Sequence, residues 1–352
     1  MISGDAVQCL RAVSSVKGER SLSGKNLRLA VVGLGKMGLV HAGVLNVLPS
    51  SHVVALCEKS KLIRKFAVKV FKGLEIVDDV MKLSGLDLDA VYVTTPIPSH
   101  FAVGKTVLQK GIAHHIFVEK TLAYSYEQSK QLAELAGAQG CVNMVGYLRR
   151  FYVTFRKARE LIMGDAIGEV DSFKACAYSS DFLGTERGPG RPASRGGVLR
   201  DLGCHAIDLA LWFFGDLETR SAKSSVKDGF TCDDLNFKVA ASQLTGEFDV
   251  SWLKANYRLP EVWFSVSGSK GGLDVNDDVV KLRLKSGESI TWYRHDLKDN
   301  VPFLLGLPEY YREDLSFLRS IIEGRKTEPD FLAASKVDKM IEEVEKKAGG
   351  RN

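Results

Sequence analysis

The first part of the chain alternates short apolar runs with segments of helical periodicity. Five runs predict buried strands: Leu27–Val32, His52–Cys57, Asp89–Thr94, Ile116–Val118 and Val142–Val145. The segments that predict helices between them include Leu62–Phe71, Ser99–Gln109 and Tyr126–Ala138. Strands that are apolar throughout and alternate with helices are typical of a parallel sheet covered on both faces. Right-handed crossovers then predict a doubly wound sheet over residues 27–150.

From residue 151 the pattern is different. After a linking helix at Phe155–Met163, strand-like segments follow one another: Val170–Tyr178, Phe237–Gln243, Glu247–Trp252, Glu261–Ser267 and Ile290–Tyr293. Three more amphipathic helices are predicted: Leu202–Phe214, Tyr311–Ile322 and Leu332–Lys347. Successive strands without intervening helices favour an α+β unit with a large, mostly antiparallel open sheet.

The fold class predicted is therefore α/β, with two domains of different kinds. Residues 1–26 are read as an N-terminal extension, 27–150 as the doubly wound domain, and 151–352 as a domain for substrate binding and oligomerisation. The closing helices, within 311–347, are expected to pack back on the first domain. A chain of 352 residues is long enough for two such cores.

Composition narrows the class of partner. The chain is 45% hydrophobic and 26% charged with a formal charge of +5, and it has no basic run of the kind that binds nucleic acid. No apolar stretch approaches the roughly 18 residues needed to cross a bilayer, so no membrane partner is predicted. The 6 cysteines stand singly, which favours reduced thiols in a cytoplasmic protein.

The glycine-rich turn after the first strand predicts a dinucleotide site. Its sequence, G-x-G-x-x-G, reads Gly33, Leu34, Gly35, Lys36, Met37 and Gly38. The first glycine permits a tight turn, the second lets backbone approach a pyrophosphate, and the third lets helix and strand pack closely. The free N–H groups at the helix start would bind the pyrophosphate. This context, strand before and helix after, predicts a Rossmann domain.

Glu58 ends the second strand, 20 positions after Gly38. A carboxylate there accepts hydrogen bonds from the adenosine ribose and repels a 2′-phosphate, which favours NAD over NADP. Lys59 and Lys61 could bind that phosphate if Glu58 turned away, so NADP remains an alternative cofactor.

Further residues follow the strands at the edge where ligands bind. Thr94, Thr95 and Pro96 end the Asp89–Thr94 strand and are predicted to line the ribose and nicotinamide, because the carboxyl ends of strands border the crevice. An ordinary proline-containing turn explains the same residues.

The candidates for chemistry lie in two places. Glu119 and Lys120 follow the Ile116–Val118 strand, and a helix from Asp201 would place Asp201, His205 and Asp208 on one face. Hydride transfer from a carbinol needs a group that takes the hydroxyl proton, and histidine or a buried lysine has a suitable pKa. No further metal ligand accompanies this spacing, so no metal site is predicted.

These segments resemble the glucose–fructose oxidoreductase/inositol dehydrogenase (Gfo/Idh/MocA) family. The shared motifs are G-L-G-K-M-G-x-x-H (Gly33–His41), T-P-x-x-x-H (Thr95–His100), V-E-K (Val118–Lys120), G-Y-L-R-R-F (Gly146–Phe151) and G-G-V-L-R-D-L-G-C-H-A-I-D (Gly196–Asp208). The resemblance implies that Lys120, Asp201 and His205 bind or deprotonate the reacting hydroxyl. It also implies that Glu119 and His100 help form the cofactor site. We interpret His41 as a packing residue.

One position departs from the family pattern. Thr121 stands where the family has a proline after the lysine. A cis peptide bond is costly before any residue other than proline, so the bond is expected to be trans, or else the lysine is set differently.

The resemblance implies a polyol, sugar or nucleotide sugar as substrate. Tyr147, Arg150, Arg195 and Asp208 are predicted to contact it, and guanidinium groups would suit an anionic substrate. A solvated basic loop explains the arginines equally well.

The working hypothesis is an NAD(P)-dependent oxidoreductase acting on a secondary hydroxyl or ketone of a sugar, inositol or nucleotide sugar. The alternatives are a redox-neutral glycosidase that uses NAD and a non-catalytic NAD(P)-binding protein. A homodimer or homotetramer is expected, because Trp252, Trp263 and Trp292 occur among the strands of a sheet that few helices cover.

Overall fold

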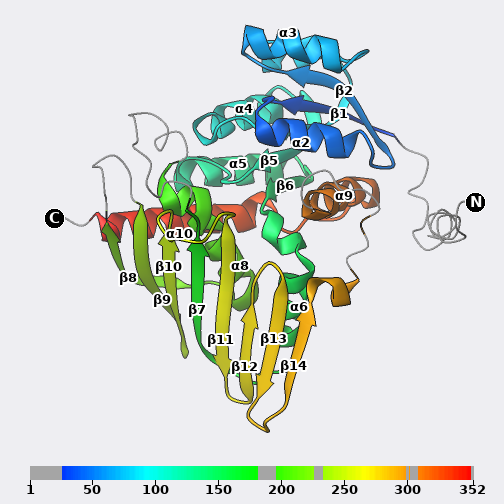
Figure 1. The fold of residues 1–352 in the computed structure, drawn as a ribbon. Helices are drawn as coiled ribbons and strands as arrows, with labels where there is room; N and C mark the ends of the chain where they lie inside the picture. Colours follow the sequence, from blue (N-terminus) through cyan, green and yellow to red (C-terminus); the bar gives the residue numbers. More distant parts are fainter. Residues whose placement is uncertain (1–25, 181–195, 226–232, 299–300, 302–307, 350–352) are drawn as a thin grey trace, which may run out of the picture.

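The computed structural model describes residues 26–180, 196–225, 233–298, 301 and 308–349. Figure 1 shows two sheets, one above the other, with helices beside and between them. The upper sheet has the order β3-β2-β1-β4-β5-β6. Its strands are β1 (Leu27–Val32), β2 (Ser51–Cys57), β3 (Glu75–Val77), β4 (Leu88–Val93), β5 (Ala113–Glu119) and β6 (Asn143–Gly146).

All neighbouring strands of this sheet are parallel, which confirms the doubly wound prediction. The connecting helices are α2 (Lys36–Leu45), α3 (Lys61–Val70), α4 (Ile97–Gln109) and α5 (Tyr126–Ala138), the last with the predicted bounds. The chain order reverses between β1 and β4, where a ligand crevice is expected. β3 was not predicted because three residues carry too little pattern.

The lower sheet has eight strands in the order β14-β13-β12-β11-β7-β10-β9-β8. They are β7 (Val170–Tyr178), β8 (Glu218–Ser225), β9 (Asp234–Ala241), β10 (Leu244–Ser251), β11 (Glu261–Gly268), β12 (Gly271–Val275), β13 (Val279–Leu284) and β14 (Ser289–Tyr293). Only the β7–β10 pair is parallel among these strands. A large, mostly antiparallel sheet is thereby confirmed.

Sequence patterns did not predict three of these strands. β8 is polar and lies at the edge of the sheet, and β12 begins with two glycines, so neither shows the alternation of a half-buried strand. β13 was not predicted either, although its residues alternate between apolar and basic from Val280 to Leu284. The predicted strand Phe237–Gln243 ends early, because Ser242 has a φ of 51° and makes the turn into β10.

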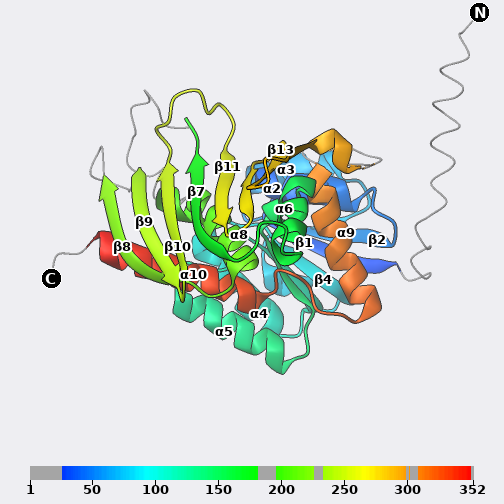
Figure 2. The ribbon, with the colours of Figure 1, turned by 90° about the horizontal axis from the view of Figure 1, so that it is seen from below.

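Helices α6 (Val153–Met163) and α8 (Cys204–Phe214) lie on one face of the large sheet. Helix α10 (Phe331–Ala348) packs against α5 and β8, so it lies between the two sheets (Figure 2). Helix α9 (Pro308–Glu323) packs against α2 and the short turn Leu148–Phe151. The C-terminal helices therefore fill the space where the two sheets meet.

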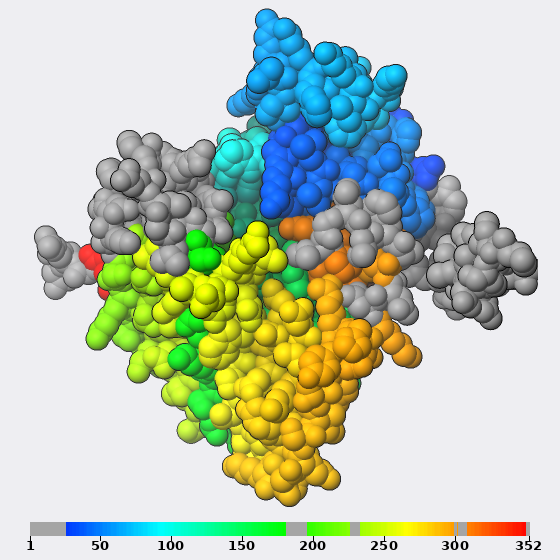
Figure 3. All heavy atoms as spheres, in the orientation of Figure 1, coloured from blue at the N-terminus to red at the C-terminus, as the bar shows by residue number. Residues whose placement is uncertain are grey.

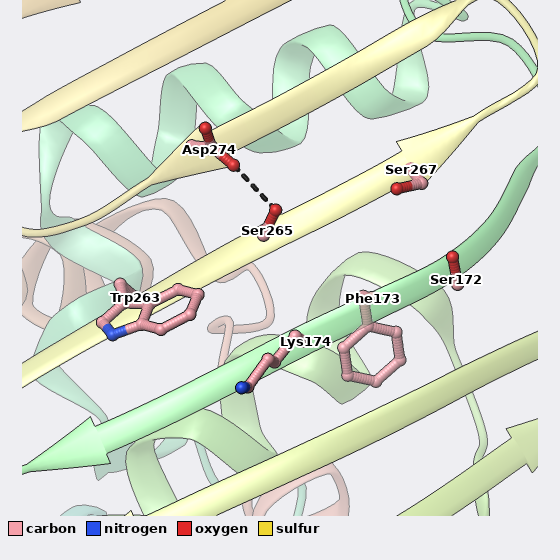
Figure 4. Close-up of a pocket in the computed structure, with 7 residues that line it drawn as sticks. All are labelled: Ser172, Phe173, Lys174, Trp263, Ser265, Ser267 and Asp274. Carbon is pink, nitrogen blue, oxygen red and sulfur yellow. Dashed lines mark hydrogen bonds between the residues drawn. The ribbon is translucent and has the colours of Figure 1, made fainter.

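The other face of the large sheet carries none of the helices of the described residues and forms part of the surface (Figure 3). A shallow hollow there has both polar and aromatic side chains (Figure 4). It is lined by Ser172, Phe173, Lys174, Trp263, Ser265, Ser267 and Asp274. Two of the three tryptophans named from the sequence do not lie on this face. Trp252 is wholly buried, and Trp292 pairs in register with the buried Val280, so its side chain lies on the helix side.

None of the helices in the described part of the chain is long and apolar enough to cross a membrane.

Candidate functional site

The glycine turn has the shape of a nucleotide cradle. Gly33 has a φ of 97°, and a Cβ on Gly38 would lie 1.9 Å from the Gly33 carbonyl oxygen, so both positions require glycine. A Cβ on Gly35 would meet no atom within 4 Å. Gly35 also begins α2 without a side-chain cap. Open space therefore lies against uncapped N–H groups, as binding of a pyrophosphate requires.

Glu58 is held at the rim of this turn by backbone. Its Oε2 accepts a hydrogen bond from the Leu34 N–H at 2.8 Å, and its Oε1 accepts one from the Ser60 N–H at 2.7 Å. The carboxylate is thus fixed beside the glycine turn. Each oxygen retains a lone pair with which to accept a ribose hydroxyl.

The end of β4 is tied to the same turn. The Thr94 hydroxyl donates to the Gly33 carbonyl at 2.7 Å. His100 is buried, with Nε2 2.6 Å from the Thr95 carbonyl oxygen and Nδ1 2.8 Å from that of Thr121. Pro96 precedes α4 as its cap. The structure thus brings these predicted cofactor residues together, with His100 joining the loops after β4 and β5 instead of projecting from them.

Lys36 and Met37 complete the predicted turn. Lys36 is exposed at the first position of α2. The Met37 sulfur lies 3.8 Å from the hydroxyl of Tyr310 in α9, so α9 covers this part of the turn.

Lys120, directly after β5, reaches across to the second half of the chain. Its Nζ donates to the Asp201 carbonyl and lies 3.3 Å from Asp201 Oδ1. Burial opposes the charge, but the Asp201 carboxylate raises the pKa of Lys120. Lys120 is therefore an ammonium group at neutral pH, with 19% of its side chain exposed.

The peptide bond between Lys120 and Thr121 is cis, so the first of the two expected alternatives, a trans bond, is wrong. Thr121 is wholly buried, and its hydroxyl donates to the Ala123 carbonyl at 3.2 Å. The Ala123 N–H donates in turn to Asp338 of α10. The loop after β5 is therefore held by two hydrogen bonds, one between Thr121 and His100 of α4 and one between Ala123 and Asp338 of α10.

His205, in the first turn of α8, lies close to this lysine. Burial, followed by the charges of Arg149 and Lys120, lowers the pKa of His205 well below its usual value. Its Nδ1 is buried without a hydrogen-bond partner among the described residues. The Tyr147 ring meets the imidazole edge-on, with centroids 6.3 Å apart. His205 is therefore a neutral imidazole beside a cation.

Asp201, His205 and Asp208 have different surroundings. A π-helical turn, Leu199–Gly203, contains Asp201 and precedes α8, which contains His205 and Asp208. Asp201 contacts Lys120, whereas Asp208 is 1% exposed and forms a two-pronged ion pair with Arg150 at 2.6–3.1 Å. Arg150 and Asp208 are thus engaged with each other behind His205.

The remaining predicted substrate residues are placed differently. Tyr147 is wholly buried, and its hydroxyl has no hydrogen-bond partner within the described ranges. Arg195 lies outside the described residues. Within those residues, no group of three or more His, Cys, Asp or Glu side chains is arranged to hold a metal ion.

One buried group was missed by sequence reasoning. His41 lies between Glu119, at 3.1 Å, and Asp314 of α9, at 2.9 Å. The G-x-G-x-x-G-x-x-H spacing marked His41, but nothing near it in sequence indicated a carboxylate 273 positions away.

Two family models match the chain. The first, described as an oxidoreductase family with an NAD-binding Rossmann fold, matches residues 27–147, and the second, the GFO/IDH/MocA C-terminal domain, matches residues 155–274. Inositol 2-dehydrogenase of Rhizobium meliloti is 25% identical over 324 residues, covering 88% of this chain and 93% of that protein. The scyllo-inositol 2-dehydrogenase (NAD(+)) of Bacillus subtilis is 28% identical over 200 residues, 54% of each chain.

Several other curated relatives are likewise matched over about half of their length. Among solved structures, levoglucosan dehydrogenase in complex with NADH has a TM-score of 0.82 at 21% identity, covering 92% of this chain and 97% of that chain. This likeness shows the fold.

Replacing Gly38 by alanine is expected to abolish binding of NADH, because the added Cβ would overlap the Gly33 carbonyl. Quenching of protein fluorescence on titration with NADH measures the effect. Gly137→Ala in α5 is the matched control, since a Cβ there meets nothing within 4 Å. Unchanged affinity in the Gly38→Ala protein would contradict the assignment of this turn.

Proposed function

Because the chain belongs to the Gfo/Idh/MocA family of oxidoreductases with an NAD-binding Rossmann fold, we propose that it is an NAD-dependent dehydrogenase of CH–OH groups. It transfers hydride between nicotinamide and a secondary hydroxyl or ketone of a sugar, inositol or nucleotide sugar. One observation carries this proposal: Lys120, directly after β5, contacts Asp201, four positions before His205, and the Lys120 charge helps to lower the pKa of His205.

The two side chains have complementary tasks. Lys120 is charged and donates a hydrogen bond to the reacting oxygen, where it stabilises the negative charge that develops as the hydroxyl proton leaves. His205 is neutral and accepts that proton. The nicotinamide, when bound, supplies the hydride acceptor. In the reverse direction His205 returns the proton to the carbonyl oxygen of the ketone.

The site supports a division of labour between two domains, 27–150 for the dinucleotide and 151–352 for the substrate. Lys120 comes from the first, and Asp201 and His205 come from the second. A substrate held by the second domain would thus meet the cofactor where the two sheets approach each other.

The cofactor proposed is NAD, with NADP as the alternative. Glu58 supports NAD, because two backbone N–H groups hold its carboxylate beside the glycine turn, where it would repel a 2′-phosphate.

The substrate class rests on similarity and on the polar side chains of the site. Relatives named inositol 2-dehydrogenase and D-apiose dehydrogenase support a polyol or sugar. Arg150 already neutralises Asp208, which argues against a role for Arg150 in recognising an anionic substrate. We propose that Arg150 and Asp208 fix α8, and Tyr147 the His205 ring, instead of contacting substrate directly.

Absorbance of NADH during a screen of polyols, sugars, uronic acids and nucleotide sugars tests the function. We expect turnover that falls by about 10²–10⁴-fold in His205→Ala, the typical contribution of a general base. His295→Ala, at an exposed position, is the matched control. NADH binding with no turnover on any compound would refute the dehydrogenase. Sugar release from glycosides without net NADH would instead identify the redox-neutral glycosidase.

The pH dependence of oxidation should reflect the neutral His205. Since burial and two cations lower the pKa of His205 below 6.5, kcat/KM should stay constant as the pH falls to 6.5 and decline only below it. The positive nicotinamide shifts this limb further in the same direction. A measured acid limb centred above pH 6.5 that disappears in His205→Asn would contradict this protonation scheme.

We further propose a cytoplasmic homodimer or homotetramer that uses the uncovered face of the large sheet. The mixed charges around the hollow, Lys174 and Asp274 among them, suit contact with a second copy of the same face. Sedimentation equilibrium at micromolar concentration should give a multiple of 38.7 kDa, and Trp263→Arg should lower it. A monomer mass would refute the proposal.

A further inference from the structure

His41 lies between two carboxylates that come from distant parts of the chain. Its Nε2 is 3.1 Å from Glu119 Oε1, and its Nδ1 is 2.9 Å from Asp314 Oδ1. His41 and Asp314 are wholly buried, and Glu119 is 8% exposed. Removing one member of such a buried set leaves an uncompensated charge, which is strongly unfavourable.

The contacts of His41 favour its charged form. An imidazole with a carboxylate oxygen on each side donates from both nitrogens. Burial opposes this charge, but Asp314 and Glu119 raise the pKa of His41 well above its usual value. Burial also opposes ionisation of Glu119, yet His41, and then Lys120, lower the pKa of Glu119. The group is therefore an imidazolium held between acids.

Other titratable groups also face His41, and their pKa shifts are consistent with its position between Glu119 and Asp314. Burial raises the pKa of Asp314, and His41 opposes that shift. Glu313, also in α9, is buried with no hydrogen-bond partner on either oxygen among the described residues, and burial raises its pKa, so it keeps its proton. The rings of Tyr92 and Tyr310 lie 5.6 and 5.8 Å from the imidazole and exclude water.

Glu119 connects this group to the reacting end of Lys120. Its second oxygen, Oε2, accepts a hydrogen bond from the Lys120 N–H at 3.0 Å. The carboxylate is closely packed, since a Cβ on Gly146 would lie 3.1 Å from Oε2. A shift of the carboxylate therefore moves the peptide from which the Lys120 side chain extends toward Asp201.

We propose that His41 is a positioning residue of the catalytic centre: anchored by Asp314 of α9, it fixes Glu119 and thereby the backbone of Lys120. The inference rests on the proposed dehydrogenase function. It gives α9, a helix from the C-terminal part of the chain, a task in catalysis without contact with substrate.

The experiment compares His41→Asn and Asp314→Asn with the exposed controls His295→Asn and Asp216→Asn. Each protein is assayed for melting temperature, NADH affinity, kcat and KM. The rate at which acetic anhydride modifies Lys120, followed by peptide mass spectrometry, reports the position of the amine independently of turnover.

We expect His41→Asn to lower kcat by about 10–100-fold, because a displacement of about 1 Å in a catalytic group has an effect of this size. KM and NADH affinity should change little, and Lys120 should be modified faster as its contact with Asp201 loosens. Asp314→Asn should have the same effects to a smaller extent, since an amide oxygen still accepts from Nδ1. The Asp314→Asn protein is the variant on which the proposal is tested if His41→Asn does not fold.

Unchanged kcat and unchanged modification of Lys120 in folded Asp314→Asn protein would overturn the proposal. A loss of kcat without a change in Lys120 modification would also overturn it, since the effect would then bypass Lys120. If the unaltered protein turns over no substrate, the dehydrogenase proposal fails, while the modification rates still decide whether His41 positions Lys120.

Discussion

The contact between Lys120 and Asp201 joins residues 81 positions apart, one directly after a parallel strand and the other in the π-helical turn Leu199–Gly203. It determines which groups are charged at the site. Asp201 keeps Lys120 protonated despite burial, and the resulting cation, together with Arg149, keeps His205 neutral. A charged hydrogen-bond donor and a neutral proton acceptor thus coexist at the site at neutral pH, as the proposed transfer of the hydroxyl proton to His205 requires.

The surroundings of this contact show how buried charge is arranged. On one side, the imidazolium of His41 holds Glu119, whose carboxylate fixes the Lys120 peptide. On the other, Arg150 and Asp208 neutralise each other behind His205. Each buried charge named here has a partner of opposite sign, which agrees with the large free-energy cost of an unpaired ion inside a protein. The helices that supply these partners, α8 and α9, therefore support the site as well as the core.

The comparison of sequence with structure is most informative where patterns are local. The strand before Gly33, the glycine spacing and Glu58 are contained in a short segment, and the structure arranges them as a cradle with an open position at Gly35. Strand periodicity likewise identified most of both sheets. It did not identify β8, because an edge strand with polar residues on both faces lacks alternation. Nor did it place Trp252, which directly follows β10 and is wholly buried.

By itself the sequence determined the two-domain class, the dinucleotide turn and the identity of Lys120 and His205 as candidates, because each depends on neighbours within a few positions or on a shared motif. Only the tertiary structure decided which of these side chains meet. In the fold Asp201 contacts Lys120, 81 positions before it, and Asp208 pairs with Arg150. The pKa shifts follow from burial and from charges brought together across the chain, and no linear pattern carries that information.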